Sequence, residues 1–351
     1  MTDDDKLDET SSRGSKLAAR PEVSRRAFIQ MTAATTLLAD LSLHAEKLDN
    51  SSRVAYRTLG RTGEHVSCIG LGGGHIGIQA TEEESIGIVR AALDSGINFL
   101  DNCWDYNQGQ SEVRMGKALT EGYRNKAFLM TKIDGHTRAA AAQQIDESLR
   151  RLQTDHLDLL QFHEVIRPDD PEKIFGPGGS MEAVLAAKEA GKLHYIGFTG
   201  HKSPDIHLKM LDTARKHRFH FDSVQMPLNL MDAHYESFEK KVLPVLVEEG
   251  VGVLGMKPLA AGNILKSNTV SAVDCLRYAL SLPTSVVITG CSSMENLEQA
   301  LSVARNYQAL SGAEVTALLE KTAEVAKAGE YEGYKNTNRF DGTIKNPQWL
   351  G

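Results

Sequence analysis

Cysteine is scarce in this sequence, and its few thiols stand far apart. The 351 residues include four cysteines without a CxxC pair, which argues against a zinc-ribbon or iron–sulfur site. Positive charge is also in short supply, since 39 lysines and arginines face 46 aspartates and glutamates. We expect no nucleic-acid partner, because such proteins present a clustered basic face. No apolar run reaches the roughly 18 residues of a membrane span, so no span is expected. The thiols, read as ordinary and not as metal ligands, are Cys68, Cys103, Cys275 and Cys291.

The first fifty residues differ in kind from the rest. Residues 1–22 are polar and lack apolar periodicity, which is typical of a disordered leader. Residues 24–29 read Ser-Arg-Arg-Ala-Phe-Ile and resemble a twin-arginine export signal, with an apolar stretch over 31–39 and a cleavage triplet at 43–45. We therefore expect the twin-arginine machinery to export the protein to the periplasm. Asp40 interrupts the apolar region and supports the alternative, a flexible leader on a cytoplasmic protein.

From residue 53 onward, short apolar runs alternate with amphipathic segments. A hairpin with strands at 56–58 and 65–67 comes first. Eight apolar runs then predict buried strands, over 68–72, 97–101, 127–131, 157–162, 194–198, 223–226, 251–256 and 285–289. Helices are expected after them, over 82–95, 111–121, 137–152, 181–190, 204–217, 235–249, 270–282 and 295–304. Eight such units in about 250 residues predict an α/β fold, a (β/α)8 TIM barrel spanning 53–305.

An open, doubly wound sheet is the alternative to the barrel. Its phosphate site would lie in the first turn between strand and helix, where this chain reads Gly-Leu-Gly-Gly-Gly over 70–74. No GxGxxG motif opens a helix there, which disfavours this alternative. Beyond the barrel, residues 306–351 are expected to pack on it. They would form one more helix, over 313–328, and a surface loop over 331–351.

Four polar side chains follow three successive strands, at the end where TIM barrels carry their active sites. They are Asp101, Tyr106, Lys132 and His163. A tyrosine titrates near pH 10 in water, so we expect the Lys132 ammonium to lower the pKa of Tyr106, with Asp101 holding the lysine in place. His163 would orient a carbonyl oxygen by a hydrogen bond. Together they predict a proton donor aimed at one oxygen, without a hydrolytic nucleophile–base pair or a metal triad.

The segments that carry these groups resemble the aldo-keto reductase family, in order and spacing, across about residues 53–305. The matching segments are 94–101, Tyr106 with 109–112, 130–132 and 158–163. The resemblance implies NAD(P)H-dependent reduction of an aldehyde or ketone to an alcohol, or the reverse, on a TIM barrel. It also implies that Tyr106 is the general acid, that Lys132 and Asp101 tune it, and that His163 orients the carbonyl.

The resemblance also places a nicotinamide site after the next strands. Thr199 stands in place of a serine, and Gly200 in place of an asparagine whose side chain it lacks, so His201 or the backbone would serve there. Gln225 matches a glutamine that binds the nicotinamide. Met256 replaces an aromatic residue that stacks on it.

A phosphate site is implied on both sides of the last strand. The expected pyrophosphate contacts are Lys257, Leu259 and Gly262, and those at a helix start are Gly290, Ser292, Ser293, Asn296 and Glu298. Ser292 stands where the family motif has a cation, and Ala300 where it has an asparagine. Lys257 would supply the missing charge. NADPH is the expected cofactor, with NADH as the alternative.

Substrate contacts are less specific. Trp104 beside Tyr106 is a candidate wall of the substrate site, the loop over 165–180 a candidate lid, and Trp349 a candidate contact from the tail. The expected partner is a small carbonyl compound. The alternative function is a nucleotide-binding sensor or scaffold with little turnover, and Tyr106→Phe separates the two because only a reductase would lose turnover.

Overall fold

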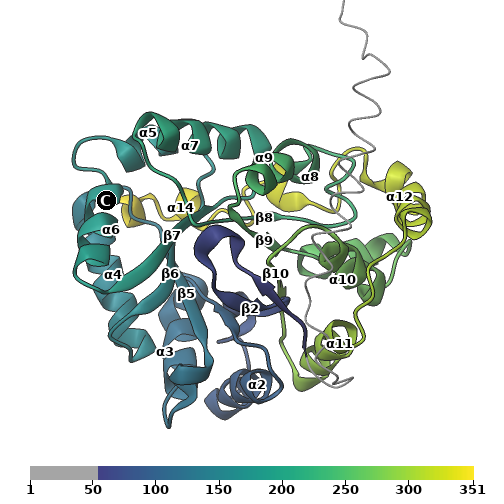
Figure 1. The fold of residues 1–351 in the computed structure, drawn as a ribbon, viewed down its shortest axis with the longest axis horizontal. Helices are drawn as coiled ribbons and strands as arrows, with labels where there is room; N and C mark the ends of the chain where they lie inside the picture. The colour runs from purple at the N-terminus through teal and green to yellow at the C-terminus, as the bar shows by residue number, and fades with distance from the viewer. Residues whose placement is uncertain (1–53) are drawn as a thin grey trace, which may run out of the picture. The chain divides into compact units, whose positions relative to one another are not determined.

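Eight parallel strands close into a barrel in the computed structural model, which describes residues 54–351 (Figure 1). The order around the barrel follows the chain, and β10 pairs with β3 to close it. The predicted TIM barrel is therefore confirmed. The predicted export signal lies outside the described residues. The barrel strands are β3 (Ile69–Gly72), β4 (Phe99–Asp101), β5 (Phe128–Ile133), β6 (Leu157–Phe162), β7 (Leu193–Thr199), β8 (Ser223–Pro227), β9 (Gly252–Met256) and β10 (Val286–Gly290).

Helices surround the barrel and bury their apolar faces against its strands (Figure 1). Several begin at a side chain that accepts a backbone N–H, as Thr81 does with Glu84 in a capping box. The covering helices are α2 (Glu82–Asp94), α3 (Gln110–Ala118), α4 (Arg138–Leu152), α6 (Ser180–Glu189), α7 (Pro204–Lys216), α10 (Ala272–Ser281) and α11 (Met294–Arg305). Short 3-10 turns lie between them: η3 (Gly73–His75), η4 (Tyr106–Gly109), η5 (Tyr123–Lys126), η6 (Ala260–Gly262) and η7 (Ile264–Ser267).

The predicted hairpin closes the amino-terminal end of the barrel. Its strands are β1 (Tyr56–Thr58) and β2 (His65–Ser67), joined through η2 (Gly60–Thr62). Leu59 and Val66 are buried in one apolar cluster with residues that line the barrel interior, such as Phe99 and Leu254. The opposite end, where the strands finish, is therefore left for the functional groups.

Two segments depart from the predicted pattern. The helix expected over 235–249 is instead two short ones, α8 (Phe238–Lys241) and α9 (Leu243–Glu248), because Pro244 starts a new helix and cannot continue one. The segment 165–180, predicted as a loop, contains helix α5 (Asp170–Phe175). Ile174 and Phe175 of that helix are buried in the main core, which favours a fixed wall over a mobile lid.

The surface loop predicted for residues 331–351 is wrong. After α12 (Gly312–Ala326), this segment, which we call the tail, forms α13 (Gly333–Asn336), α14 (Gly342–Lys345) and η8 (Pro347–Leu350). Tyr334 and Lys335 are buried, and Tyr334 packs in one cluster with residues of α10 and α12. Between residues 54 and 351 we find no helix with the length and apolar character needed to span a membrane.

Candidate active site

The strand register brings the four predicted site residues to one end of the barrel. Asp101 is the last residue of β4 and pairs with Met130, so Lys132 lies two residues further along β5. His163 follows the last residue of β6, and Tyr106 opens η4 beyond β4. Parallel strands end at the same edge, and these side chains therefore converge.

Lys132 is the centre of the group. Its ammonium forms an ion pair with the Asp101 carboxylate and donates to the Asn102 carbonyl oxygen at 2.7 Å. It also lies 3.4 Å from the Tyr106 hydroxyl. The Lys132 side chain is only 1% exposed, so its charge acts on its neighbours with little screening by water.

The expected lowering of the Tyr106 pKa is wrong for this arrangement. Burial raises the pKa of Tyr106 well above its usual value, and the Asp101, Asp105 and Glu164 carboxylates raise it further. The ammonium of Lys132 is already paired with Asp101. The phenol therefore keeps its proton at neutral pH.

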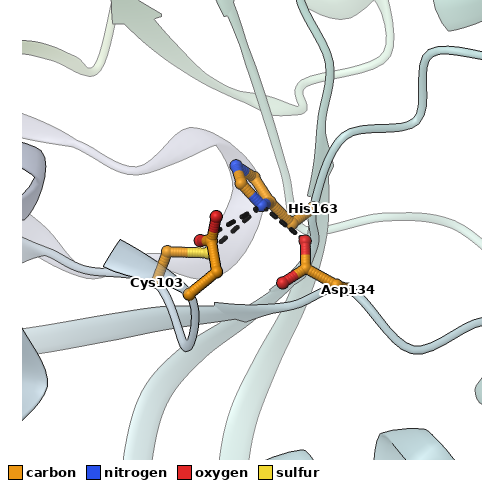
Figure 2. Close-up of side chains that lie close together, drawn as sticks. Cys103, Asp134 and His163 are labelled. Atoms are coloured by element: carbon orange, nitrogen blue, oxygen red, sulfur yellow. Dashed lines mark hydrogen bonds and ion pairs between the residues drawn. The ribbon is translucent and has the colours of Figure 1, made fainter. Parts of the chain in front are cut away.

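His163 completes the group from the other side of Tyr106. The two rings meet edge to face, with 5.8 Å between their centroids. His163 Nδ1 lies 2.8 Å from Asp134 Oδ1 and 3.2 Å from Cys103 Sγ (Figure 2). Burial alone would lower the pKa of His163, but the Asp105 and Asp134 carboxylates outweigh burial and raise it to about 9.

Four neighbours of this site were absent from the sequence prediction: Cys103, Asp105, Asp134 and Glu164. Asp134 comes directly after β5, which extends two residues beyond the predicted strand 127–131. Cys103 and Asp105 stand in the segment between Asp101 and Tyr106. Their signal was the same one that identified the other residues, namely a polar side chain at a strand end.

The residues implied for the nicotinamide lie together on β7, β8 and β9. Gln225 Nε2 donates to Asp101 Oδ2 at 3.2 Å, while its Oε1 is buried without a hydrogen-bond partner. Thr199 Oγ1 lies 3.9 Å from Met256 Sδ. A buried acceptor beside a hydroxyl group suits the N–H groups of a carboxamide. These residues therefore fit the nicotinamide that the family resemblance implies.

Gly200 packs closely against the backbone, and His201 contacts the tail. A Cβ atom at Gly200 would lie 2.4 Å from the Val165 carbonyl oxygen, so a longer side chain has no room there. His201 Nε2 lies 2.9 Å from Asp341 Oδ1, which ties this ring to the tail. In this backbone a side chain at position 200 has no room, and one nitrogen of the His201 ring is held by the tail.

Lys257 contacts the tail at the same end of the barrel. Its ammonium is 5.4 Å from the Tyr334 ring and 5.5 Å from the Phe340 ring, both from the tail. Burial lowers the pKa of Lys257 to about 8. Leu259 is half-buried, whereas Gly262 has φ +81° and open space where a Cβ would lie.

The implied phosphate site is the exposed start of α11. Ser293 caps the helix by accepting from the Asn296 N–H, and Ser292 Oγ donates to Asn296 Oδ1 at 2.8 Å. The charged residue of the first turn is an acid, Glu295, and Glu298 is exposed one turn on. At Gly290, a Cβ would overlap the ring of His75, which explains the glycine.

Trp104 stands beside the site and meets the tail. Its Nε1 donates to Glu147 Oε2 at 2.8 Å, and its ring meets Trp349 edge to face at 5.6 Å. Trp349, the candidate contact from the tail, therefore lies against Trp104. The tail therefore meets the segment that carries Tyr106, through the contact of Trp349 with Trp104.

Comparison with known proteins fits this geometry. A sequence model of the aldo/keto reductase family matches residues 68–274. The chain belongs to this family. L-galactose dehydrogenase from Arabidopsis thaliana is 30% identical over 315 residues, covering 77% of this chain and 95% of its own. Aldo-keto reductase AMT2 from Alternaria alternata is 31% identical over 271 residues, covering 64% of this chain and 71% of its own.

Solved structures agree with the sequence comparison. The holo form of aldo-keto reductase AKR11C1 from Bacillus halodurans superposes with a TM-score of 0.65 at 26% identity, covering 78% of this chain and all of its own. This aldo/keto reductase is therefore an oxidoreductase that uses a nicotinamide cofactor to interconvert carbonyl and alcohol groups.

Proposed function

We propose that the Tyr106 hydroxyl gives its proton to the oxygen of the bound carbonyl during reduction. One observation supports this assignment above all. The hydroxyl lies 3.4 Å from the Lys132 ammonium, which Asp101 and the Asn102 carbonyl hold in place. An ammonium at that distance stabilises the phenolate that remains after the proton has left.

The bound nicotinamide supplies the hydride for the carbonyl carbon, and the residues of the chain act on the oxygen. The Tyr106 O–H bond breaks as the alcohol O–H bond forms, and the negative charge on Tyr106 faces Lys132. His163 lies edge-on to the same ring, which suits a hydrogen bond to the carbonyl oxygen. In alcohol oxidation the proton returns to Tyr106.

We propose NADPH as the cofactor, with NADH accepted almost as well. Gln225 and Thr199 would hold the carboxamide and Met256 would cover the ring, while the loop from Lys257 to Gly262 would pass the pyrophosphate. The start of α11 offers backbone N–H groups to a phosphate, but its first turn has no cation to select the phosphate of NADPH. Dissociation constants for the two cofactors test this, and a ratio above about 100 would contradict it.

The decisive experiment compares the protein with Tyr106→Phe, using an aromatic aldehyde or a quinone as substrate. Loss of the proton donor should lower kcat by about 10³-fold, because a general acid contributes roughly 10²–10⁴-fold. Cofactor affinity should stay within about twofold, since the phenyl ring remains. Binding of cofactor without turnover by the parent protein would instead support the sensor or scaffold alternative.

For the substrate we propose a small carbonyl compound that reaches Tyr106 past Trp104 and Trp349. The two indoles meet edge to face and combine apolar rings with polar N–H groups. Sugars and aromatic compounds bind to surfaces of this kind. The similarity to L-galactose dehydrogenase makes L-galactose the first sugar to test, assayed as oxidation with NAD⁺ or NADP⁺. Equal kcat/KM values for the protein and its Trp104→Ala variant on every active substrate would contradict this route past the indoles.

We also propose that residues 24–45 direct export to the periplasm as a folded protein. The support is the order Arg25, Arg26, Phe28 and then the apolar stretch. Cell fractionation tests the proposal, and protein that stays in the cytoplasm with both arginines intact would contradict it.

A further inference from the structure

Three side chains from two strand ends converge on one nitrogen, Nδ1 of His163. Asp134 Oδ1 lies 2.8 Å from it, Cys103 Sγ 3.2 Å and Asp105 Oδ1 3.7 Å. Figure 2 shows the contacts of Cys103 and Asp134 meeting at this nitrogen, while the second ring nitrogen points away from both residues. One N–H makes one strong hydrogen bond, and the shortest distance assigns it to Asp134.

A cysteine, a histidine and two carboxylates are also metal ligands in many proteins, and their four ligand atoms lie within 4.8 Å of one another. Ligands of a metal surround an empty central point. With bonds of about 2.0–2.3 Å, a histidine nitrogen and a carboxylate oxygen on one zinc ion stand roughly 3.3 Å apart. In this protein the contacts of the other three residues meet at the His163 Nδ1 atom itself. The 2.8 Å distance from Nδ1 to Asp134 Oδ1 is that of a hydrogen bond. The imidazole ring therefore stands where a cation would.

We propose that Asp134 is a positioning residue that keeps the His163 ring doubly protonated, with Nδ1–H on its carboxylate and Nε2–H free for the substrate oxygen. A neutral ring with its proton on Nδ1 has only a lone pair on Nε2 and cannot donate from that side. The other neutral tautomer, with its proton on Nε2, would turn the Nδ1 lone pair toward the Asp134 carboxylate at 2.8 Å. While Asp134 is ionised, donation to a carbonyl therefore requires the charged ring. The Asp134 side chain is wholly buried, so its carboxylate meets no competing water.

The charges around His163 favour the charged ring. The Asp105, Asp134 and Glu164 carboxylates face it, together with the neutral Cys103 thiol and the Tyr106 phenol, while the ammonium of Lys132 lies beyond Tyr106. These carboxylates raise the pKa of His163 to about 9 against the effect of burial. Burial raises the pKa of Asp134 to about 6. Between these values, Asp134 is ionised and His163 is protonated.

The test is the pH profile of kcat for carbonyl reduction, measured on the full chain and on Asp134→Asn. The parent protein should lose activity at high pH with an apparent pKa near 9. In the variant this limb should move toward the ordinary histidine value of about 6.5. Because Asp105 still faces the ring, losses in kcat of about 4-fold at pH 7 and about 80-fold at pH 8.5 are the largest changes expected. Cys103→Ala is the matched control, and its limb should stay near that of the parent because a thiol carries no charge.

Two further measurements separate positioning from a structural role. In a His163→Gln background, Asp134→Asn should leave kcat unchanged, because the carboxylate acts through the ring. NMR titration of the His163 imidazole, assigned with His163→Gln, should give a pKa near 9 in the parent protein without any substrate. This readout needs no folded variant at position 134 and no turnover.

The inference rests on the proposed function, in which His163 donates a hydrogen bond to the carbonyl oxygen. The outcomes below distinguish failure of that function from failure of the inference. Failure of the parent protein to reduce any carbonyl would reject the proposed function, while the NMR titration still tests whether the His163 ring is charged. An unmoved limb in Asp134→Asn, an ordinary pKa for His163, or a lower kcat for Asp134→Asn in the His163→Gln background would overturn the inference. About one equivalent of zinc or iron per chain, lost in Asp134→Asn, would also overturn it and assign a metal site instead.

Discussion

The polar groups at the carboxyl ends of the strands owe their properties to one another. Tyr106 keeps its proton because burial and three carboxylates outweigh one paired ammonium. Two of these carboxylates, Asp105 and Glu164, act in the opposite sense on a base, and together with Asp134 they hold the proton on His163. At neutral pH, Tyr106 and His163 therefore both carry the protons that carbonyl reduction needs.

Lys257 gives a prediction at the scale of one residue. Its pKa of about 8 means that the ammonium is charged below pH 8 and neutral above it. Affinity for the anionic cofactor should therefore fall as the pH rises through this value. Lys257→Met should weaken binding at pH 7 by about tenfold, the equivalent of roughly 1.4 kcal/mol, and should remove the pH dependence.

Fluorescence titration with NADPH and NADH from pH 6.5 to 9.5 measures this effect. Lys266→Met is the control, because Lys266 is exposed on η7 and its ammonium contacts Asn263. The same decline with pH in Lys257→Met as in the parent protein would show that another group carries it.

Residue identity was predictable here, but charge balance was not. Asp101, Tyr106, Lys132 and His163 could be placed together because each follows a strand of a barrel, and barrels align their strand ends. Burial is the main cause that raises the pKa of Tyr106, and one of the carboxylates that add to it is Glu164. Glu164 has φ +45° and accepts the Gly342 and Thr343 N–H groups of the tail. A contact across so many residues leaves no local pattern in the sequence.

At the scale of elements, the start of α11 gives a prediction about cofactor selection. Ser292 is exposed directly before the helix cap, where a cation would reach a bound phosphate. Ser292→Arg should therefore tighten NADPH binding by about tenfold, the gain expected from one charge-assisted contact of roughly 1.4 kcal/mol. NADH binding should change by less than twofold.

Calorimetric titration with each cofactor measures the two affinities. Ser302→Arg adds the same charge to an exposed position near the end of α11 and is the matched control. An equal gain in both variants would mean that general charge is responsible and that the helix start does not hold the phosphate.

Helices and strands that are marked by residues close in the sequence were predicted well. The capping pair Thr81 and Glu84 marks the start of α2, and the predicted strand 157–162 is β6. The helix expected over 235–249 failed because apolar periodicity continues through Pro244, although proline interrupts the backbone hydrogen bonds. Periodicity reports which face is buried and not whether the helix is continuous.

At the scale of the whole molecule, the tail is attached to the barrel by a buried ionic cluster. The Lys335 ammonium contacts Asp232 Oδ1 at 2.7 Å, Glu332 Oε2 at 3.0 Å and the Tyr235 carbonyl oxygen at 2.7 Å. The sequence suggested a surface loop here because the segment is polar. Polar residues that pair with one another when buried cannot be told from exposed ones by composition.

Lys335→Met tests this attachment. Removal of the ammonium leaves buried carboxylates unpaired, which should cost about 3–5 kcal/mol in the free energy of unfolding near pH 8. Burial raises the pKa of Glu332 to about 7, above its value in the unfolded chain, so the folded protein binds more protons between about pH 4.5 and 7. The contribution of this group to stability is therefore largest in acid and is lost as the pH rises to 7.

It follows that Lys335→Met should be most destabilised at pH 8 and less so at pH 5, where Glu332 is protonated and needs no partner. Urea unfolding of both proteins at the two pH values measures the difference. Lys345→Met is the matched control, because Lys345 is exposed in the same tail and contacts only a backbone carbonyl, that of Arg339. An equal deficit at both pH values would mean that lost packing of the lysine stem, and not unpaired charge, destabilises the variant.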